Sequence, residues 1–380
     1  MHHSLYAHLW SIEDRGQAGF VEDLRRAGLN AVSFAATYHA VRQLMPANPA
    51  RQVFYAPRSH AYFPPRGRYG RLAPEPSPLV AGRDTLGDLS QALSRSGMRC
   101  KTWVIGCHNS DLAGRCPDLA IVNALGDRLP HHLCPARGEV QQYLASLLAD
   151  LAGHYDLHAI EVESFGYSDG FEHGAHHEMS GLVIDAWHSR LLSLCFCPGC
   201  LEAATAAGVA ADALAVAIRQ ELLEWMDTPA WKSATPEVAL AFAAAHPELA
   251  AFLGVRRRVT HDLGQRLREA VHAVAPETLL IDLGGGQASP APDLLDWADG
   301  LVVRADAVTA AAARQTLGPS AYVGCGVYPM APRPLTPEQL REALTACAAA
   351  GCDGFNYYNH ALMQRSTWHD LREAIAALAG

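Results

Sequence analysis

Short apolar runs alternate with amphipathic helical patterns along the chain, and this alternation limits the possible folds more than any other feature. Each run has the length of a buried β-strand and is followed by a segment with apolar residues at helical spacing. Alternation of this kind predicts parallel strands that are joined by helices. The predicted strands are Leu5–Trp10, Asn30–Thr37, Met98–Gly106, Leu157–Glu163, Thr278–Leu283, Gly300–Val303, Ala321–Val327 and Gly354–Tyr358.

Eight strands with helices between them predict an α/β protein with a (β/α)8 barrel, the TIM-barrel architecture. The alternative is an open doubly wound sheet, which often carries the pattern Gly-x-Gly-x-x-Gly after its first strand. Here that turn reads SIEDRG, and the later run Gly284–Gly286 is followed by prolines instead of a phosphate-binding helix. The barrel is therefore the favoured prediction.

Two connections are longer than a simple strand-to-helix loop. The first covers about residues 38–83, after the second strand, and is rich in Pro, Arg and Tyr. The second covers residues 164–235, after the fourth strand, and carries a cluster of cysteines. We expect a single barrel domain over residues 1–380, with residues 164–235 as an insertion.

Composition and charge narrow the class of protein. The chain has 49% hydrophobic residues and a net charge of −9, without a basic stripe, so we expect a large core and no nucleic-acid partner. The first residues lack the pattern of a signal peptide, and no apolar run is long enough to span a membrane. These features predict a cytoplasmic protein without membrane association. In a reducing compartment, clustered cysteines favour metal binding over disulfides.

The run Cys195-x-Cys197-x-x-Cys200 lets several thiolates converge on one tetrahedral metal ion. It predicts a structural zinc site that fixes the loop after the fourth strand. The fourth ligand is expected from the loop after the third strand, where Cys116 is slightly favoured over Cys134. No organic cofactor is expected.

In a (β/α)8 barrel the active site lies at the carboxyl ends of the strands. The residues at those ends are rich in aromatic rings, which can stack on the C–H faces of a sugar, and in groups that bond hydroxyls. Clustered cations are few, which disfavours a phosphorylated substrate. We therefore expect a carbohydrate site. Its predicted binding residues are His8, Trp10, Tyr38, His39, His108, Asn109, Arg304, Asp306, Tyr328, Asn356 and Tyr358.

Glu161 and Glu163 share one face of the fourth strand because strand side chains alternate. Glu163 is nearer the rim and is the predicted general acid/base. Glu161 lies deeper, where it is predicted to hold a partner such as an arginine or histidine, or to raise the pKa of Glu163 by repulsion. A glycosidase needs a second carboxylate: Asp282 and Asp306 are the candidates, and Asp282 is preferred as base or nucleophile. Asp282 capping a loop amide, and Asp306 pairing with Arg304 or capping a helix, remain open readings.

The acidic strand end Glu161-Val162-Glu163 and the later Cys195-x-Cys197-x-x-Cys200 run, followed by an alanine-rich helix, resemble the family 42 β-galactosidases. The resemblance implies a barrel hydrolase in which Glu163 is the acid/base. It also implies that the three cysteines bind zinc with a cysteine from the preceding loop. Two departures stand out: the family has an asparagine at position 162, and its strand-seven glutamate nucleophile has no counterpart in Tyr322–Tyr328.

The predicted function is that of a glycoside hydrolase-like enzyme, a hydrolase acting on a carbohydrate or glycoside by carboxylate acid/base catalysis. One alternative is a metal-dependent sugar isomerase, epimerase or lyase, in which His, Glu and Asp residues at the barrel end bind a divalent ion. Separately, histidines 173, 176 and 177 of the insertion are either ligands of a catalytic metal or hydrogen-bond donors near the substrate. A second alternative is a sugar-binding barrel without catalysis. The sequence leaves open the sugar, the stereochemical outcome and the oligomeric state, a homo-oligomer included.

Overall fold

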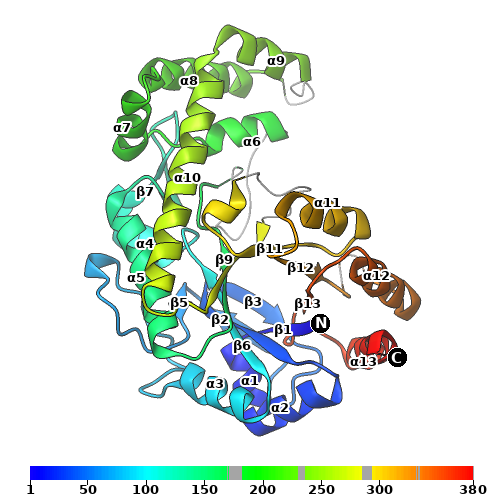
Figure 1. Ribbon diagram of the computed structural model, residues 1–380. Helices are drawn as coiled ribbons and strands as arrows, with labels where there is room; N and C mark the ends of the chain where they lie inside the picture. The colour runs from blue at the N-terminus through cyan, green and yellow to red at the C-terminus, as the bar shows by residue number, and fades with distance from the viewer. Residues whose placement is uncertain are drawn as a thin grey trace.

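The computed structural model describes residues 1–168, 170, 182–229, 236–284, 293–330, 332 and 334–379. Its centre is a closed barrel of eight parallel strands, because β1 pairs with both β2 and β13 (Figure 1). The predicted (β/α)8 barrel is thereby confirmed. The barrel strands are β1 (His2–Ala7), β2 (Ala31–Tyr38), β6 (Arg99–Ile105), β9 (Ala159–Glu163), β10 (Leu279–Asp282), β11 (Gly300–Arg304), β12 (Tyr322–Val327) and β13 (Gly354–Tyr357).

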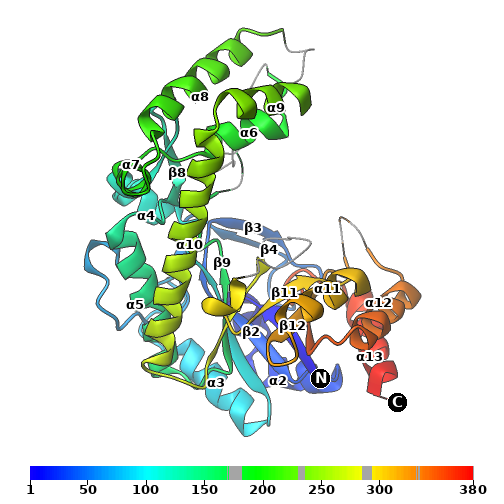
Figure 2. The same cartoon turned by 45° about the horizontal axis from the view of Figure 1, so that its top comes forward.

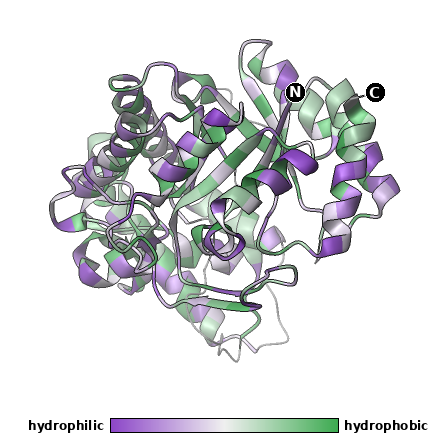
Figure 3. Ribbon diagram, turned by 90° about the horizontal axis from the view of Figure 1, so that it is seen from below, coloured by the Kyte–Doolittle hydropathy of each residue, from purple (hydrophilic) through white to green (hydrophobic). Residues whose placement is uncertain are grey.

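Helices surround the barrel and bury their apolar faces against the outer side of the strands. In Figure 3 the central strands are mostly hydrophobic, and polar residues concentrate on the helices and loops. Capping residues mark the start of several helices. Thr336, for example, caps the helix that begins at Pro337 and forms a capping box with Gln339. The surrounding helices are α1 (Leu9–Arg15), α2 (Gln17–Arg26), α3 (Thr85–Arg95), α5 (Gly138–His154), α10 (Glu248–His272), α11 (Ala307–Leu317), α12 (Pro337–Ala349) and α13 (Arg365–Ala379).

The long connection after β2 contains regular structure. The strands β3 (Val41–Leu44) and β4 (Val53–Ala56) form an antiparallel hairpin, and β5 (His60–Ala61) pairs antiparallel with β2. The connection after β6 contains α4 (Ser110–Arg115) and a second hairpin, formed by β7 (Ala120–Val122) and β8 (Arg128–Leu133). Both hairpins follow the carboxyl end of a barrel strand, so they help to build the rim where a site is expected.

The segment after β9 forms a separate helical layer. It contains α6 (Ala186–Ser193), α7 (Pro198–Ala206), α8 (Ala211–Met226) and α9 (Pro236–Ala245). These helices lie together at one end of α10, beyond the barrel (Figures 1 and 2). Their buried side chains form a second apolar cluster with Leu249 and Phe252 of α10, whereas Leu263 and Leu267 of the same helix belong to the barrel core.

The first strand ends earlier than predicted. The ladder between β1 and β2 stops at Ala7, and the chain enters α1 at Leu9, so Trp10 is helical. Among the described residues, no single helix is long and apolar enough to cross a membrane, although α9 and α10 pass that test as a pair bent by 90°.

Candidate functional site

The parallel register determines which side chains face the barrel interior. Trp103 is in register with Glu161, and Ile105 is in register with Glu163, so these four residues share one face. Lys101 lies two residues before Trp103 and therefore shares that face as well. The fourth strand thus directs both of its glutamates inward, one above the other.

Glu161 lies at the bottom of this stack in a closed polar network. It forms an ion pair with Lys101, and both side chains are fully buried. Glu161 also accepts hydrogen bonds from the Ser33 hydroxyl (2.6 Å) and from the Asn356 amide (2.7 Å). All of these partners come from other strands, so the network ties β2, β6, β9 and β13 together. The predicted binding residue Asn356 is thus part of this network, and the partner of Glu161 is Lys101 instead of the expected arginine or histidine.

We expect the Lys101→Met variant to be less stable than the wild type by about 3–5 kcal/mol, because it leaves the buried Glu161 charge without its counter-ion. The free energy of unfolding, from urea titration, measures the loss. The double variant Lys101→Met/Glu161→Gln removes both charges and should recover most of it. A loss below about 1 kcal/mol for Lys101→Met would contradict a buried structural pair.

Glu163 lies above Glu161, at the carboxyl end of β9. The indole N–H of Trp103 donates a hydrogen bond to its Oε2 atom at 2.6 Å. Burial raises the pKa of Glu163 above its ordinary value, and the Trp103 hydrogen bond offsets part of that rise. A carboxyl group whose pKa is raised in this way keeps its proton closer to neutral pH, as a general acid requires.

Aromatic rings from several strands surround Glu163. Trp103 packs edge-on against Tyr6 (5.1 Å between ring centroids), Tyr38 (4.9 Å) and Tyr358 (5.9 Å). Tyr328 continues this set, with its ring 5.1 Å from that of Tyr358. Burial raises the pKa of all four tyrosines, and the Glu163 carboxylate adds a smaller contribution to each, which places them around it. Tyr328 is 56% exposed, so this aromatic group opens to solvent at the rim.

His8 is fully buried beside this group, and its ring packs against Tyr38. The side-chain oxygen of Asn359 accepts the Ala361 N–H. Its side-chain amide nitrogen therefore faces His8 and donates to Nδ1 at 3.2 Å. Burial lowers the pKa of His8 to about 3, so the ring is neutral and carries its proton on Nε2. Within the described residues, Nε2 has no hydrogen-bond partner. His8 therefore offers one buried donor beside the aromatic group.

Trp10 does not take the place that the sequence predicted. It lies in α1, is fully buried, and donates its indole N–H to Gln43 at 2.9 Å. Its ring stacks between His8 and Phe54. The prediction is wrong because it extends the strand through His8, which is the N-cap of α1. Trp10 is a packing residue behind His8 and has no surface left for a sugar.

The other predicted binding residues divide into two groups. His39 and His108 have ring centroids 5.1 Å apart, and the buried His131 and His132 of β8 extend this set. Sequence reasoning missed the two β8 histidines because no periodic pattern marks this short hairpin. Asn109, in contrast, is the N-cap of α4 and accepts the Leu112 N–H at 2.9 Å.

Asp306 and Arg304 have structural contacts of their own. Asp306 is the N-cap of α11 and accepts hydrogen bonds from the Thr309 N–H (2.8 Å) and the Thr309 hydroxyl (2.7 Å). The Arg304 side chain is 73% exposed and pairs with Asp306 at 3.0 Å. The reading of Asp306 as a helix cap and partner of Arg304 is the one that these contacts match.

Asp282 ends β10 in register with Val162, whereas Ile281 is in register with Glu161. Its side chain therefore starts on the face opposite to the glutamates, towards the helices. Burial raises the pKa of Asp282 to about 6 from an ordinary 3.8, and a hydrogen bond from the Gly284 backbone opposes the rise. With this register the Asp282 side chain does not face Glu163 across the barrel.

The raised pKa of Asp282 means that its protonated form stabilises the folded protein relative to the unfolded chain. That contribution is fully present below pH 3.8 and is lost as the pH rises through about 6. We expect Asp282→Asn to raise the free energy of unfolding by about 1–3 kcal/mol at pH 8 and to leave it unchanged near pH 4. Denaturant titrations at both pH values measure this difference.

The Asp306→Asn variant is the control for Asp282→Asn, with the opposite sign. The Thr309 contacts and Arg304 lower the pKa of Asp306, so its contribution to stability is present at high pH and is lost on acidification. Asp306→Asn should therefore lower stability at pH 8. A gain from both variants, or from neither, would contradict the assignment of these two environments.

Four buried cysteines form the strongest candidate metal centre. Cys134, Cys195, Cys197 and Cys200 have sulfur atoms within 4.8 Å of one another. Cys134 Sγ lies 3.5 Å from Cys197 and Cys200 and 3.7 Å from Cys195. Tetrahedral zinc with Zn–S bonds of about 2.3 Å separates its sulfur ligands by about 3.8 Å. The four thiols therefore fit a tetrahedral metal ion, and hydrogen bonds from the other thiols lower the pKa of Cys197.

The fourth member of the cluster is Cys134, so the preference for Cys116 was wrong. Cys116 ends α4 and packs in the barrel core, apart from the cysteine cluster. Cys134 directly follows β8, whose partner β7 lies beside the cysteine run. The Val122 N–H donates to Cys195 Sγ at 3.4 Å, and the Val122 carbonyl accepts the Phe196 N–H at 2.7 Å. The β7–β8 hairpin thus places Cys134 beside the other three cysteines. Histidines 173, 176 and 177 lie outside the described residues.

Comparisons with known proteins support the fold. No protein-family model and no curated protein sequence matches this chain. Among solved structures, it is similar to α-L-fucosidase isoenzyme 2 from Paenibacillus thiaminolyticus (TM-score 0.64, 14% identity, 100% of this chain and 49% of the fucosidase chain). It is also similar to the PgaB (BpsB) glycoside hydrolase domain from Bordetella bronchiseptica (TM-score 0.59, 13% identity, 99% of both chains).

The predicted resemblance to family 42 is also found in the structure comparison. Gan42B, a GH42 β-galactosidase from G. stearothermophilus, matches with a TM-score of 0.57 and 12% identity over 100% of this chain and 56% of the galactosidase chain. The chain thus spans about half the length of the fucosidase and of this galactosidase. At such low identity these similarities establish a shared fold, and the structural neighbours that carry it are glycoside hydrolases.

Proposed function

We propose that this chain is a glycoside hydrolase-like enzyme that acts on a carbohydrate or glycoside, with Glu163 as its general acid. The observation that carries the proposal is the position of Glu163: a buried carboxyl group of raised pKa at the carboxyl end of a barrel strand, surrounded by aromatic rings. The site of a (β/α)8 enzyme lies at that end. The glycoside hydrolases among the structural neighbours support this choice of chemistry.

The proposed roles follow from the contacts. Trp103 binds one oxygen of Glu163, which leaves Oε1 to carry the proton towards the glycosidic oxygen. Tyr358 and Tyr328 supply ring faces for the sugar, and Tyr38 and His8 pack behind them as buried support. The buried network of Glu161 holds the strands that position these groups and takes no proton from substrate.

The second carboxylate distinguishes hydrolysis from binding. Asp282 is the predicted base or nucleophile, but its register places its side chain on the face opposite to Glu163, and burial brings its pKa to about 6. That register favours one second candidate function, a sugar-binding barrel without turnover. Cysteine-closed metal sites are structural, with no open position for substrate, so the described metal cluster gives no support to a metal-dependent isomerase.

A panel of 4-nitrophenyl glycosides, varied in sugar and anomeric configuration, tests the proposal with the wild-type protein. Turnover of at least one member is the expected result, and NMR of the first-formed sugar reports retention or inversion. Binding of a sugar without turnover over long incubation would favour the binding barrel. The absence of both binding and turnover across neutral sugars and their oligomers would overturn the proposal.

Trp103→Phe should move the pH dependence of the reaction. The Trp103 N–H stabilises the charged form of Glu163, so its removal raises the pKa of Glu163 further. The acid form then persists to higher pH, so the alkaline limb of the kcat/KM profile should shift to higher pH. Tyr143→Phe, which changes a buried aromatic residue of α5, is the matched control and should leave that limb in place. A downward shift for Trp103→Phe would contradict the role of this hydrogen bond.

A further inference from the structure

A cavity of about 320 Å³ lies outside the aromatic group, between α2 and α13. Its lining includes four arginines, Arg15, Arg26, Arg365 and Arg372, against one carboxylate, Asp23. This excess of positive over negative side chains contrasts with the net charge of −9 of the whole chain. A cavity of this size is within the range of small-molecule sites. Its occupant should therefore be small and negatively charged.

The four arginines differ in how far they are already neutralised. Arg15 forms a two-point ion pair with Asp23, and Arg26 pairs with Glu22, which also binds Arg25. The α13 arginines are different: within the described residues, Arg365 and Arg372 have no hydrogen-bond or ion-pair partner. Both guanidinium groups keep the planar donor fork that matches a phosphate or carboxylate group.

The inner side of the cavity is aromatic and can recognise a hydroxyl. Trp368 packs edge-on against the ring of His360, and both line the cavity. The Ser11 hydroxyl donates to the His8 carbonyl at 2.9 Å, so Ser11 accepts the Nδ1–H of His360 at 3.0 Å. Burial lowers the pKa of His360 to about 4, so its ring is neutral and Nε2 is an acceptor. A ring next to the arginines would thus meet an aromatic face and a hydroxyl acceptor.

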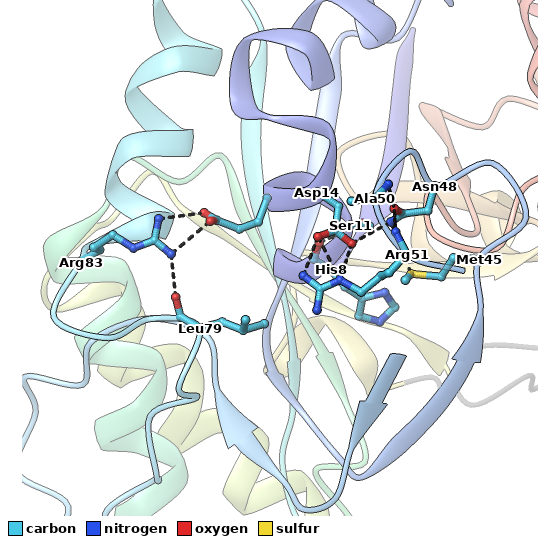
Figure 4. A network of polar contacts seen from close by, with 10 residues as sticks. His8, Ser11, Asp14, Met45, Asn48, Ala50, Arg51, Leu79 and Arg83 are labelled. Carbon is cyan, nitrogen blue, oxygen red and sulfur yellow. Dashed lines mark hydrogen bonds and ion pairs between the residues drawn. The ribbon is translucent and has the colours of Figure 1, made fainter. Parts of the chain in front are cut away.

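The remaining wall is a preformed loop. Asp14 receives a hydrogen bond from the Asn48 amide (3.0 Å) and pairs with Arg51, while Asn48 accepts the Ala50 and Arg51 backbone N–H groups. Figure 4 shows the Asn48 and Arg51 side chains converging on Asp14, with Ser11 beside His8. Because the loop side chains are bound to one another, the wall is set before any ligand arrives.

We propose that the cavity between α2 and α13 binds a small hydroxylated ring compound that carries an oxyanion group, a sugar phosphate or a sugar carboxylate. Arg365 and Arg372 hold the oxyanion, Trp368 packs against the ring and His360 accepts a hydroxyl. The site is separate from the Glu163 region, and its inner wall is connected to that region through the Ser11 contact with His8. The proposal does not depend on glycosidase activity, because it concerns binding alone.

Isothermal titration calorimetry with four probes tests this site: glucose 6-phosphate, glucuronate, inorganic phosphate and glucose. The cavity variant is Arg365→Gln/Arg372→Gln. The control is Arg258→Gln/Arg341→Gln, which removes the same charge from two exposed helix positions elsewhere. We expect glucose 6-phosphate or glucuronate to bind the wild type and the control equally, and the cavity variant at least about tenfold more weakly.

The pattern across probes separates the two sources of the oxyanion. Binding of glucose 6-phosphate alone assigns a phosphoryl group, and binding of glucuronate alone assigns a carboxylate. Equal binding of inorganic phosphate and glucose 6-phosphate would overturn recognition of the ring. The site itself is overturned if no anionic probe binds at millimolar concentration, or if the cavity variant binds as tightly as the control.

Discussion

Replacing Glu163 with glutamine should lower kcat/KM by about 10²–10⁴ on the glycoside that the wild type hydrolyses, because the variant cannot protonate the leaving oxygen. Glutamine keeps the size of the side chain and can still accept the Trp103 N–H through its amide oxygen. The fold should therefore be preserved, and the loss should appear in turnover, measured by release of the aryl alcohol at matched protein concentration.

The dependence on leaving group distinguishes acid catalysis from a general loss of structure. A 4-nitrophenolate departs with little help, whereas a phenyl or alkyl leaving group needs the proton. The loss for Glu163→Gln should therefore grow as the leaving group becomes more basic. Glu342→Gln, an exposed glutamate on α12, is the matched control and should show wild-type rates. Equal losses for good and poor leaving groups would show that Glu163 is not the general acid.

Much of the barrel could be predicted because it rests on local pattern. The fourth strand was expected to end at Glu163, and β9 does end there. The second strand was expected at residues 30–37 and is observed at 31–38. Such apolar runs are bounded by polar residues and turns, so their ends are visible in sequence. The first strand was extended too far because Tyr6, His8 and Trp10 alternate correctly, although the ladder partners of β1 end at Ala7.

The partners of the site residues could not be predicted, because they depend on which strands become neighbours. Lys101 gives no local signal, since it sits in an apolar strand, and only the register of β6 with β9 brings it to Glu161. The strand-end rule likewise pointed to Asp282, but a one-residue difference in register decides which face it takes. Periodicity shows the alternation within a strand and carries no information on the pairing between strands.

Which of Cys116 and Cys134 joins the cysteine cluster also depends on contacts between segments that are distant in the sequence. Both cysteines lie in the connection after β6, so chain distance to the cysteine run does not separate them. The β7–β8 hairpin places Cys134 in the cluster. This hairpin is short and contains Pro130 and two histidines, so its sequence does not resemble a typical strand. Tertiary contacts with the helical layer stabilise this hairpin: Phe196 donates its N–H to the Val122 carbonyl at 2.7 Å.

Removal of the metal should have the largest effect on stability. We propose that the four thiols bind zinc, since their sulfur spacing fits a tetrahedral ion. Structural zinc contributes its binding free energy directly to folding, about 10 kcal/mol or more in small zinc-binding peptides. In this chain the cluster joins Cys134, beside the barrel, to the helical layer, so its loss should release the packing of α7 against the β7–β8 hairpin.

We therefore expect one zinc per chain by elemental analysis, and a Tm lowered by several degrees after chelation. Cys134→Ser should lose the metal and show that lowered Tm without chelator, because three sulfur ligands leave the site incomplete. Cys116→Ser is the matched control: it removes a buried thiol from the same connection and should keep both the metal and the wild-type response to chelator. Chelator should have no further effect on Cys134→Ser. Equal metal content in the two variants, or a wild-type Tm that chelator leaves unchanged, would contradict a structural zinc at this position.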